Sequence, residues 1–167
     1  MPAINAQQWT RGDAFTISND NRYLDVDMIF HFLSKESYWS QDIPVELVKK
    51  MIENSTVCFG VYERIPASDS LKQVGFARVV SDLVRFAWLA DVFILPDYRG
   101  LGLSKWLMNI ITEQPYLKGA RFMLVTKDAQ GLYAQFGFEI IENPENFMQR
   151  PYNTEVVIRE HTQSTSK

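Results

Sequence analysis

The feature that most constrains this chain is an apolar run that leads through a glycine-containing turn directly into a helical pattern. Residues 85–95 are largely apolar, as in a buried β-strand. The segment Arg99-Gly100-Leu101-Gly102-Leu103-Ser104 follows. From Leu103 onward, apolar residues recur at i, i+3, i+4, i+7 and i+8, which predicts an amphipathic helix that ends near Pro115. The chain must therefore place a strand, a glycine turn and a helix in close succession.

The neighbouring apolar runs predict how this strand is paired. Residues 120–126 read as a second buried strand, so the strand, the helix and this strand form a right-handed βαβ unit with parallel strands. Two earlier runs, at 56–63 and 72–81, are separated by polar linkers and predict an antiparallel meander with 85–95. The predicted class is α/β, with a mixed sheet flanked by helices.

Helical spacing also predicts two helices before the meander. Asp25 is a suitable N-cap for the first helix. Pro44 suits the first turn of the second helix, which should end near Asn54. Shorter runs predict a strand at 14–18, a short helix at about 128–136, and strands near 138–142 and 154–159.

Length and composition exclude several classes of protein. The 167 residues suit one domain, which we expect to span residues 1–160 and to be followed by a polar tail at 161–167. The net charge of -3 provides no basic field, so nucleic acid is not an expected partner. No apolar stretch approaches the roughly 20 residues that cross a bilayer, and no secretory signal is visible, so we expect a cytoplasmic protein without membrane association. Cys58, the only cysteine, predicts a buried thiol, and no metal site is predicted.

The glycine turn has the features of an anion site. Backbone N–H groups at a helix N-terminus lack intrahelical acceptors, and glycines let a phosphate approach them closely. Arg99 adds a permanent positive charge. A dinucleotide-binding fingerprint would need glycine where Lys105 stands, and the P-loop pattern G-x-x-x-x-G-K-[ST] is absent. From these residues alone, a plain helix-start turn without a ligand remains the alternative.

With the strand before it, the segment from Arg99 to Ser104 resembles the signature loop [RQ]-x-x-G-x-[GA] of the GNAT superfamily of acyl-CoA N-acyltransferases. Ser104 is a departure, because glycine or alanine is usual at that position. The segment from Ala129 to Phe138 resembles the family's A-x-x-x-Y-x-x-x-G-F element, and the two motifs stand in the family's order. The resemblance covers roughly residues 57–142 and implies a mostly antiparallel central sheet with a splayed strand pair at an acyl-CoA site.

The resemblance implies acetyl-CoA as co-substrate. Its pyrophosphate would lie against the glycine turn, and its pantetheine arm would pair with backbone groups of the preceding strand, like an added strand. Thr126 stands where many relatives carry an asparagine that bonds the pantetheine. The expected cofactor-binding residues are Phe93, Ile94, Leu95, Arg99, Gly100, Leu101, Gly102, Leu103, Ser104, Thr126 and Ala129.

The implied chemistry is transfer of an acetyl group to a primary amine of a small molecule or peptide, by direct attack in a ternary complex. Tyr133 corresponds to the family's general acid for the departing thiolate, or it packs against the sheet. Asp91 is the only carboxylate in 85–95 and is expected to act as a base, as an anchor for the substrate ammonium, or as a buried hydrogen-bonding group. The retained Tyr133 favours catalysis over the alternative, a non-catalytic acyl-CoA-binding or regulatory module.

The acceptor is expected along the loop between the two N-terminal helices. Tyr38 and Trp39 lie there near Asp42, and aromatic rings beside a carboxylate suit an amine, although the same rings also fit a role in closing the core. Arg78 is a further candidate on the acceptor side, although a solvated or salt-bridged strand arginine is the commoner case. Dimers are common in the family, so a homodimer is a possible assembly.

Overall fold

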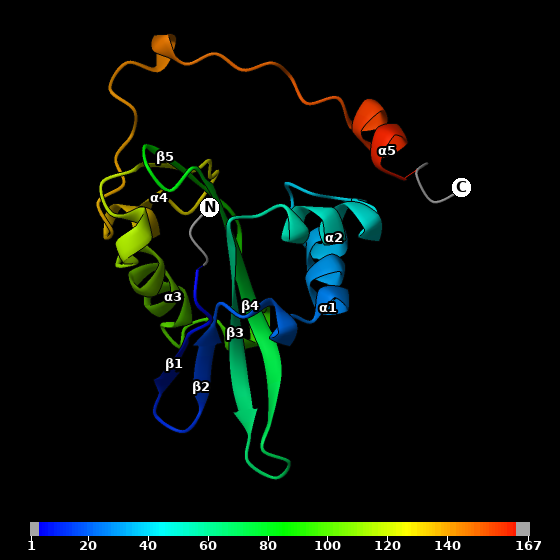
Figure 1. Cartoon of the computed structure of the whole chain (residues 1–167), viewed down its shortest axis with the longest axis vertical. Helices are drawn as coiled ribbons and strands as arrows, with labels where there is room; N and C mark the ends of the chain where they lie inside the picture. Colours follow the sequence, from blue (N-terminus) through cyan, green and yellow to red (C-terminus); the bar gives the residue numbers. More distant parts are fainter. Residues whose placement is uncertain (1–3, 163–167) are drawn as a thin grey trace.

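The computed structural model describes residues 4–162 and consists of one six-stranded sheet with helices on both sides (Figure 1). The strands lie in chain order, β1-β2-β3-β4-β5-β6. Neighbouring strands are antiparallel except for β5 and β6, which are parallel. The mixed α/β class, the meander and the parallel βαβ unit are therefore confirmed.

The strands are β1 Gln8–Arg11, β2 Phe15–Ser18, β3 Val57–Ile65, β4 Ser70–Ser81, β5 Phe86–Ile94 and β6 Arg121–Met123. The α-helices among the described residues are α1 Val26–His31, α2 Val45–Glu53, α3 Leu103–Thr112, α4 Gln130–Ala134 and α5 Thr154–Thr162. A π-helical stretch, Phe32–Glu36, extends α1, and short 3₁₀ turns occur at Asn21–Tyr23, Pro96–Tyr98, Pro115–Leu117 and Pro144–Asn146. No described helix combines the length and the apolar character needed to span a bilayer.

The start of α1 and both ends of α2 lie where the sequence predicts them. The Asp25 side chain accepts a hydrogen bond from the Met28 amide at 3.0 Å and caps α1. Pro44 precedes α2, and Asn54 is its C-cap. Caps of this kind satisfy backbone groups that a helix leaves free at its ends. The boundaries of α1 and α2 are therefore set locally.

Two apolar clusters pack on opposite faces of the sheet. One lies beneath α3 and includes Leu89 and Leu107, whereas the other lies beneath α1 and α2 and includes Ile29, Phe76 and Phe93. Figure 1 shows α3 and α4 on one side of the sheet and α1 and α2 on the other. A group that enters between these two layers at the sheet edge can therefore meet side chains from both.

β5 and β6 separate along their length. They pair only through Phe86–Trp88 of β5 and Arg121–Met123 of β6. β5 continues to Ile94, while the chain after Met123 leaves the sheet. The resulting gap at the carboxyl ends of the two strands is the splayed pair that the family resemblance implied.

The predictions for the C-terminal third are partly wrong. Residues 120–126 form only the three-residue strand β6, and Val125 is exposed. Residues 138–142 form no strand, and 154–159 lies in α5. The β-branched residues there favour a strand, but the Asn153 side chain caps the Val156 amide, and without a neighbouring strand this local signal decides.

Two further details differ from the sequence prediction at the ends of the chain. The edge strand β1 was not predicted, because its residues are mostly exposed and show little apolar alternation. The expected polar tail begins within α5, whose last residue is Thr162, and residues 163–167 lie outside the described residues.

Candidate active site

A bulge in β5 decides which of its side chains face the site. Leu89 and Ile94 both pack in the cluster beneath α3, although five residues separate them and a regular strand would put them on opposite faces. The register with β4 shifts in this region, between Phe76 and Arg78. Asp91 has a φ of 52°, a left-handed conformation that few non-glycine residues adopt. The bulge turns the Asp91 carboxylate away from α3 and toward Arg78.

Asp91 is held by two hydrogen bonds on this face of the sheet. Its Oδ2 accepts from Nε of Arg78, and its Oδ1 accepts from Nε1 of Trp39 at 3.0 Å. The side chain of Asp91 is 5% exposed and that of Arg78 is 17% exposed. The salt-bridged arginine weighed in the sequence analysis is therefore what the structure contains, and the carboxylate is fixed in direction.

Tyr133 reaches the same region from α4. Burial, reinforced by the nearby Tyr38 and Asp128, raises the pKa of Tyr133 to about 12. The phenol therefore keeps its proton at neutral pH and is able to donate it in a hydrogen bond. Its ring also packs edge-on against Phe138, with 5.8 Å between the centroids. The acid role and the packing role weighed for Tyr133 are thus compatible.

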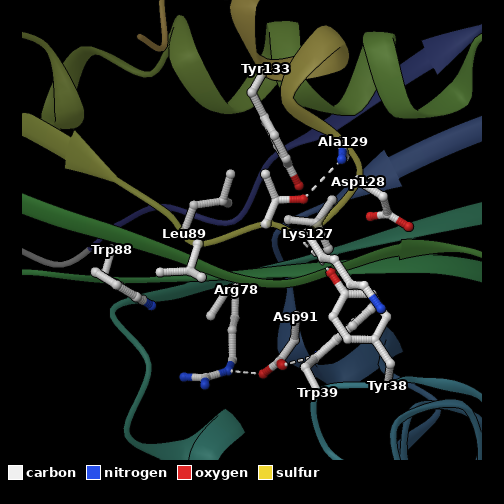
Figure 2. Close-up of a pocket in the computed structure, with 14 residues that line it drawn as sticks. Tyr38, Trp39, Arg78, Trp88, Leu89, Asp91, Lys127, Asp128, Ala129 and Tyr133 are labelled. Atoms are coloured by element: carbon white, nitrogen blue, oxygen red, sulfur yellow. Dashed lines mark hydrogen bonds and ion pairs between the residues drawn. The ribbon is translucent and has the colours of Figure 1, made fainter. Parts of the chain in front are cut away.

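A cavity of about 450 Å³ connects these groups at the gap between β5 and the loop after β6. Figure 2 shows Tyr133 entering from one side, while Asp91, Arg78 and Trp39 lie on the other. Trp88 of β5 also lines the cavity. A phenol that donates, a fixed carboxylate and a guanidinium therefore line one open cavity, supplied by both layers of the fold.

The loop after α1 forms one wall of the cavity and is attached to the loop after β6. The Tyr38 hydroxyl accepts a hydrogen bond from the Lys127 amide at 3.1 Å, and the Lys127 ammonium lies 5.7 Å from the Tyr38 ring. Tyr38 is 49% exposed and Trp39 is 42% exposed. These rings therefore do not close the core, which was the alternative for them, but stand at the cavity wall.

The glycine turn has the conformation that an anion site needs. Gly100 and Gly102 have φ of 78° and 72°, and α3 begins directly after Gly102. Within residues 4–162, the backbone amides of Leu103, Ser104 and Lys105 have no acceptor, as is usual for the first turn of a helix. These amides, at the positive end of α3, are available to a phosphate.

Two arginines border this turn. Nη1 of Arg11, on β1, donates to the Leu101 carbonyl at 2.9 Å, and its two terminal nitrogens lie 3.5 and 3.7 Å from where a Cβ on Gly102 would stand. Nε of Arg99 donates to the Ile94 carbonyl at 3.2 Å. Arg11 was missed by the sequence reasoning because 90 residues separate it from the turn.

Several predicted cofactor residues have local roles in the fold. The Thr126 hydroxyl accepts from the Ala129 amide at 3.0 Å, which starts the turn into α4. The Leu95 amide donates to the Val74 carbonyl at 2.8 Å, so this N–H is not free for a pantetheine arm, contrary to expectation. Alternate residues of a strand direct their backbone groups to opposite edges, so the Ile94 N–H faces the gap instead, while the Ile94 carbonyl accepts from Arg99. The side chain of Leu103 is buried, which leaves its backbone for ligand contact.

The hydrogen bond from Trp39 to Asp91 is a contact that the sequence did not reveal. Trp39 was proposed as an acceptor-binding ring, and the structure shows that its indole N–H also orients Asp91 across 52 residues of sequence. Unlike Trp39, Trp88 and Lys127 were not predicted as site residues, although both line the cavity. No pattern in the sequence marks Trp88, Lys127 or the bond between Trp39 and Asp91, because these contacts arise from the positions of loops and strands in the fold.

Comparison with known proteins places this geometry in a family. The acetyltransferase (GNAT) domain family matches residues 55–140. A protein of Gibberella zeae that is named "Putative acetyltransferase FG08082" is 33% identical over 146 residues, which cover 77% of this chain and 80% of that protein. An uncharacterized N-acetyltransferase, ycf52, of Pyropia yezoensis is 33% identical over 106 residues, which cover 61% of this chain and 58% of that protein.

Solved structures agree. A crystal structure of a protein of Xanthomonas campestris pv. campestris, assigned to the GNAT acetyltransferases, superposes with a TM-score of 0.75 and 43% identity, covering 83% of this chain and 93% of that one. A probable acetyltransferase of Staphylococcus aureus, with a TM-score of 0.62 and 20% identity, shares the fold. The domain match, the sequence similarity and the shared architecture together show that this chain belongs to the GNAT family of acetyltransferases.

Proposed function

We propose that this protein transfers an acetyl group from acetyl-CoA to a primary amine of a small molecule or peptide, by direct attack in a ternary complex. The observation that carries the proposal is the cavity in which Tyr133 and Asp91 meet from opposite layers of the fold. Membership in the GNAT family supports an acyl-CoA-dependent N-acetyltransferase. The identity of the donor and the roles of the individual residues are part of the proposal.

The residues around the glycine turn fit the phosphates of acetyl-CoA. The free amides of Leu103 and Ser104, the left-handed Gly102, and the cations of Arg11 and Arg99 all favour negative charge at the start of α3. The gap between β5 and β6 would take the pantetheine arm beside Ile94. When bound, acetyl-CoA supplies an acetyl group activated as a thioester.

The side chains in the cavity divide the remaining work. During transfer a C–N bond forms and a C–S bond breaks, so the amine nitrogen must lose a proton and the sulfur must gain one. Tyr133 is protonated and would donate a hydrogen bond to the departing sulfur. Asp91, held by Arg78 and Trp39, would hold the incoming amine nitrogen and accept its proton, directly or through water. A positioned group of each kind lowers the barrier without a covalent enzyme intermediate.

A screen for thiol release tests the proposal. The protein is incubated with acetyl-CoA and a library of primary amines, and free thiol is followed with a chromogenic disulfide, while binding of CoA is measured separately by calorimetry. Amine-dependent thiol release that is lost in Tyr133→Phe is the expected result. CoA binding without thiol release for any amine would instead favour a non-catalytic acyl-CoA-binding module. A cytoplasmic location and a homodimer stay predictions from the sequence and the family resemblance.

A further inference from the structure

We infer that the acceptor is an amine that also carries a carboxylate, as in an amino acid, and that Arg78 binds this carboxylate. The inference rests on the proposed acetyl transfer and specifies its substrate class. Arg78 and Asp91 form an ion pair in the cavity wall, and together they present one cation and one anion to a ligand.

The Arg78 guanidinium uses only part of its hydrogen-bonding capacity. Nε donates to Asp91, and Nη1 reaches the Ser55 hydroxyl only at 3.5 Å, the outer limit for a hydrogen bond. Within residues 4–162, Nη2 has no acceptor. Among the described residues, Nη2 is not one of the buried polar atoms that lack a partner, so it is accessible, and the side chain, 17% exposed, lines the cavity. The terminal edge of its fork is therefore available to an acceptor from a ligand.

The charges in the cavity favour a zwitterion over a simple amine. The charge of Asp91 is already balanced by Arg78. An ammonium bound at this pair leaves an excess positive charge beside the partly buried ion pair, whereas an ammonium with a carboxylate leaves none. The other charged lining residues, Lys127 and Asp128, are opposite in sign and exposed on the loop after β6. They do not change this balance.

The planar shape of the Arg78 guanidinium favours a carboxylate over a phosphate. An arginine fork matches the planar carboxylate with two parallel hydrogen bonds. A phosphate monoester carries up to two negative charges, and the inner wall of the cavity offers Arg78 as its cation beside the rings of Trp39 and Trp88. The cavity, at about 450 Å³, lies within the range of small-ligand sites. An amino acid fits both its charge and its size.

Matched ligands and variants test the inference. The panel contains the twenty common amino acids, their carboxamides, their decarboxylated amines, and ethanolamine with phosphoethanolamine. Binding to the acetyl-CoA-free protein is measured by calorimetry, and thiol release is measured separately. At least one amino acid should exceed its carboxamide and its amine by about 10- to 100-fold in affinity and in kcat/KM, the range of a hydrogen bond to a charged group.

Variants at Arg78 should change this preference. In Arg78→Gln the preference for the carboxylate should fall to about one, and in Arg78→Lys, which keeps the charge but loses the fork, it should be intermediate. Arg64→Gln, on β3 and paired with Asp69 outside the cavity, is the matched control and should keep the full preference. Circular dichroism checks that each variant is folded.

The outcomes separate this inference from the proposed function. The inference is overturned if no amino acid binds, or if carboxamides bind as tightly as the amino acids. It is also overturned if the preference for the carboxylate survives in Arg78→Gln. A larger increase in affinity from ethanolamine to phosphoethanolamine than from any amine to its amino acid would overturn it as well. Absence of thiol release with every amine would overturn the proposed transfer, whereas the binding data would still decide whether Arg78 recognises a carboxylate.

Discussion

Leu89 and Asp91 stand two residues apart on β5, yet their side chains lie on opposite faces of the sheet. Leu89 packs beneath α3, and Asp91 bonds to Arg78 and Trp39 beneath α1 and α2. Strict alternation would put both on the same face. The left-handed conformation of Asp91 and the register shift with β4 reverse the face to which its side chain points. Asp91 therefore faces the cavity and not the core.

Tyr133→Phe tests whether the phenol acts as an acid. Without its proton donor the enzyme should lose about 10²- to 10⁴-fold in kcat, with little change in the dissociation constant of acetyl-CoA, because the ring itself is kept. Tyr116→Phe is the matched control, since Tyr116 is also largely buried with a pKa raised to about 12 but does not line the cavity. Equal turnover of the Tyr133 variant and the wild type would assign Tyr133 to packing alone.

Gly102→Val tests the anion site. A branched residue is strained at a φ of 72°, its Cβ would stand in contact with the Arg11 guanidinium, and its methyl groups would take up space that a phosphate needs. CoA binding measured by calorimetry should be abolished. Gly119→Val suffers the same kind of strain at a φ of 84°, but Gly119 lies after α3 and outside the turn, so that variant should still bind CoA. Similar loss in both variants would point to misfolding and not to a phosphate contact.

Arg11→Gln tests the second cation at the turn. Removing the guanidinium that donates to the Leu101 carbonyl should weaken CoA binding by about tenfold. This loss of affinity should be smaller at high salt, because salt partly screens a charge-assisted hydrogen bond. Arg22→Gln, whose exposed guanidinium pairs with Asp20, is the control. If Arg11→Gln binds CoA as tightly as the wild type at every salt concentration, Arg11 does not contribute to the site.

Asp91→Asn tests the buried ion pair as a unit. Breaking it leaves Arg78 without its counter-charge, and the free energy of unfolding should fall by about 3 kcal/mol. Adding Arg78→Gln to that variant should cost little more, because the uncompensated charge is then gone. Urea denaturation of the two single variants and the double variant measures the coupling. Additive losses would mean that the two residues stabilise the fold independently.

Alkaline pH should destabilise the protein through groups that the fold keeps protonated. Burial raises the pKa of Cys58 from 9.0 to about 11, and that of Tyr133 from 10.0 to about 12. Above these unperturbed values the unfolded chain loses protons that the folded chain retains, so the unfolded state gains stability. The contribution of these groups is therefore full below about pH 9 and is lost as the pH rises toward 11 to 12.

Urea denaturation between pH 8 and 11 measures this loss, and Cys58→Ala should remove the part that begins near pH 9. A free energy of unfolding that stays constant over the same range would contradict the burial of these groups.

Local signals account for most of what the sequence predicted correctly. The helix after the glycine turn, the caps at Asp25 and Asn54, and the meander follow from periodicity and from residues that act within a few positions of their own backbone. The same signals were misleading at 154–159, where β-branched residues favour a strand but no strand partner lies beside them. Strand propensity is realised only when a neighbour completes the ladder.

By itself, the sequence determined the order of strand, glycine turn and helix and the position of Tyr133, because each depends on residues close together along the chain. The tertiary structure alone decided that Asp91 turns toward Arg78 and Trp39 and that Arg11 borders the turn. All of these contacts join segments that are distant in the sequence, and those of Asp91 depend on a one-residue change of register between β4 and β5. A shift of one residue inverts every side chain beyond it, and no local pattern records where it occurs.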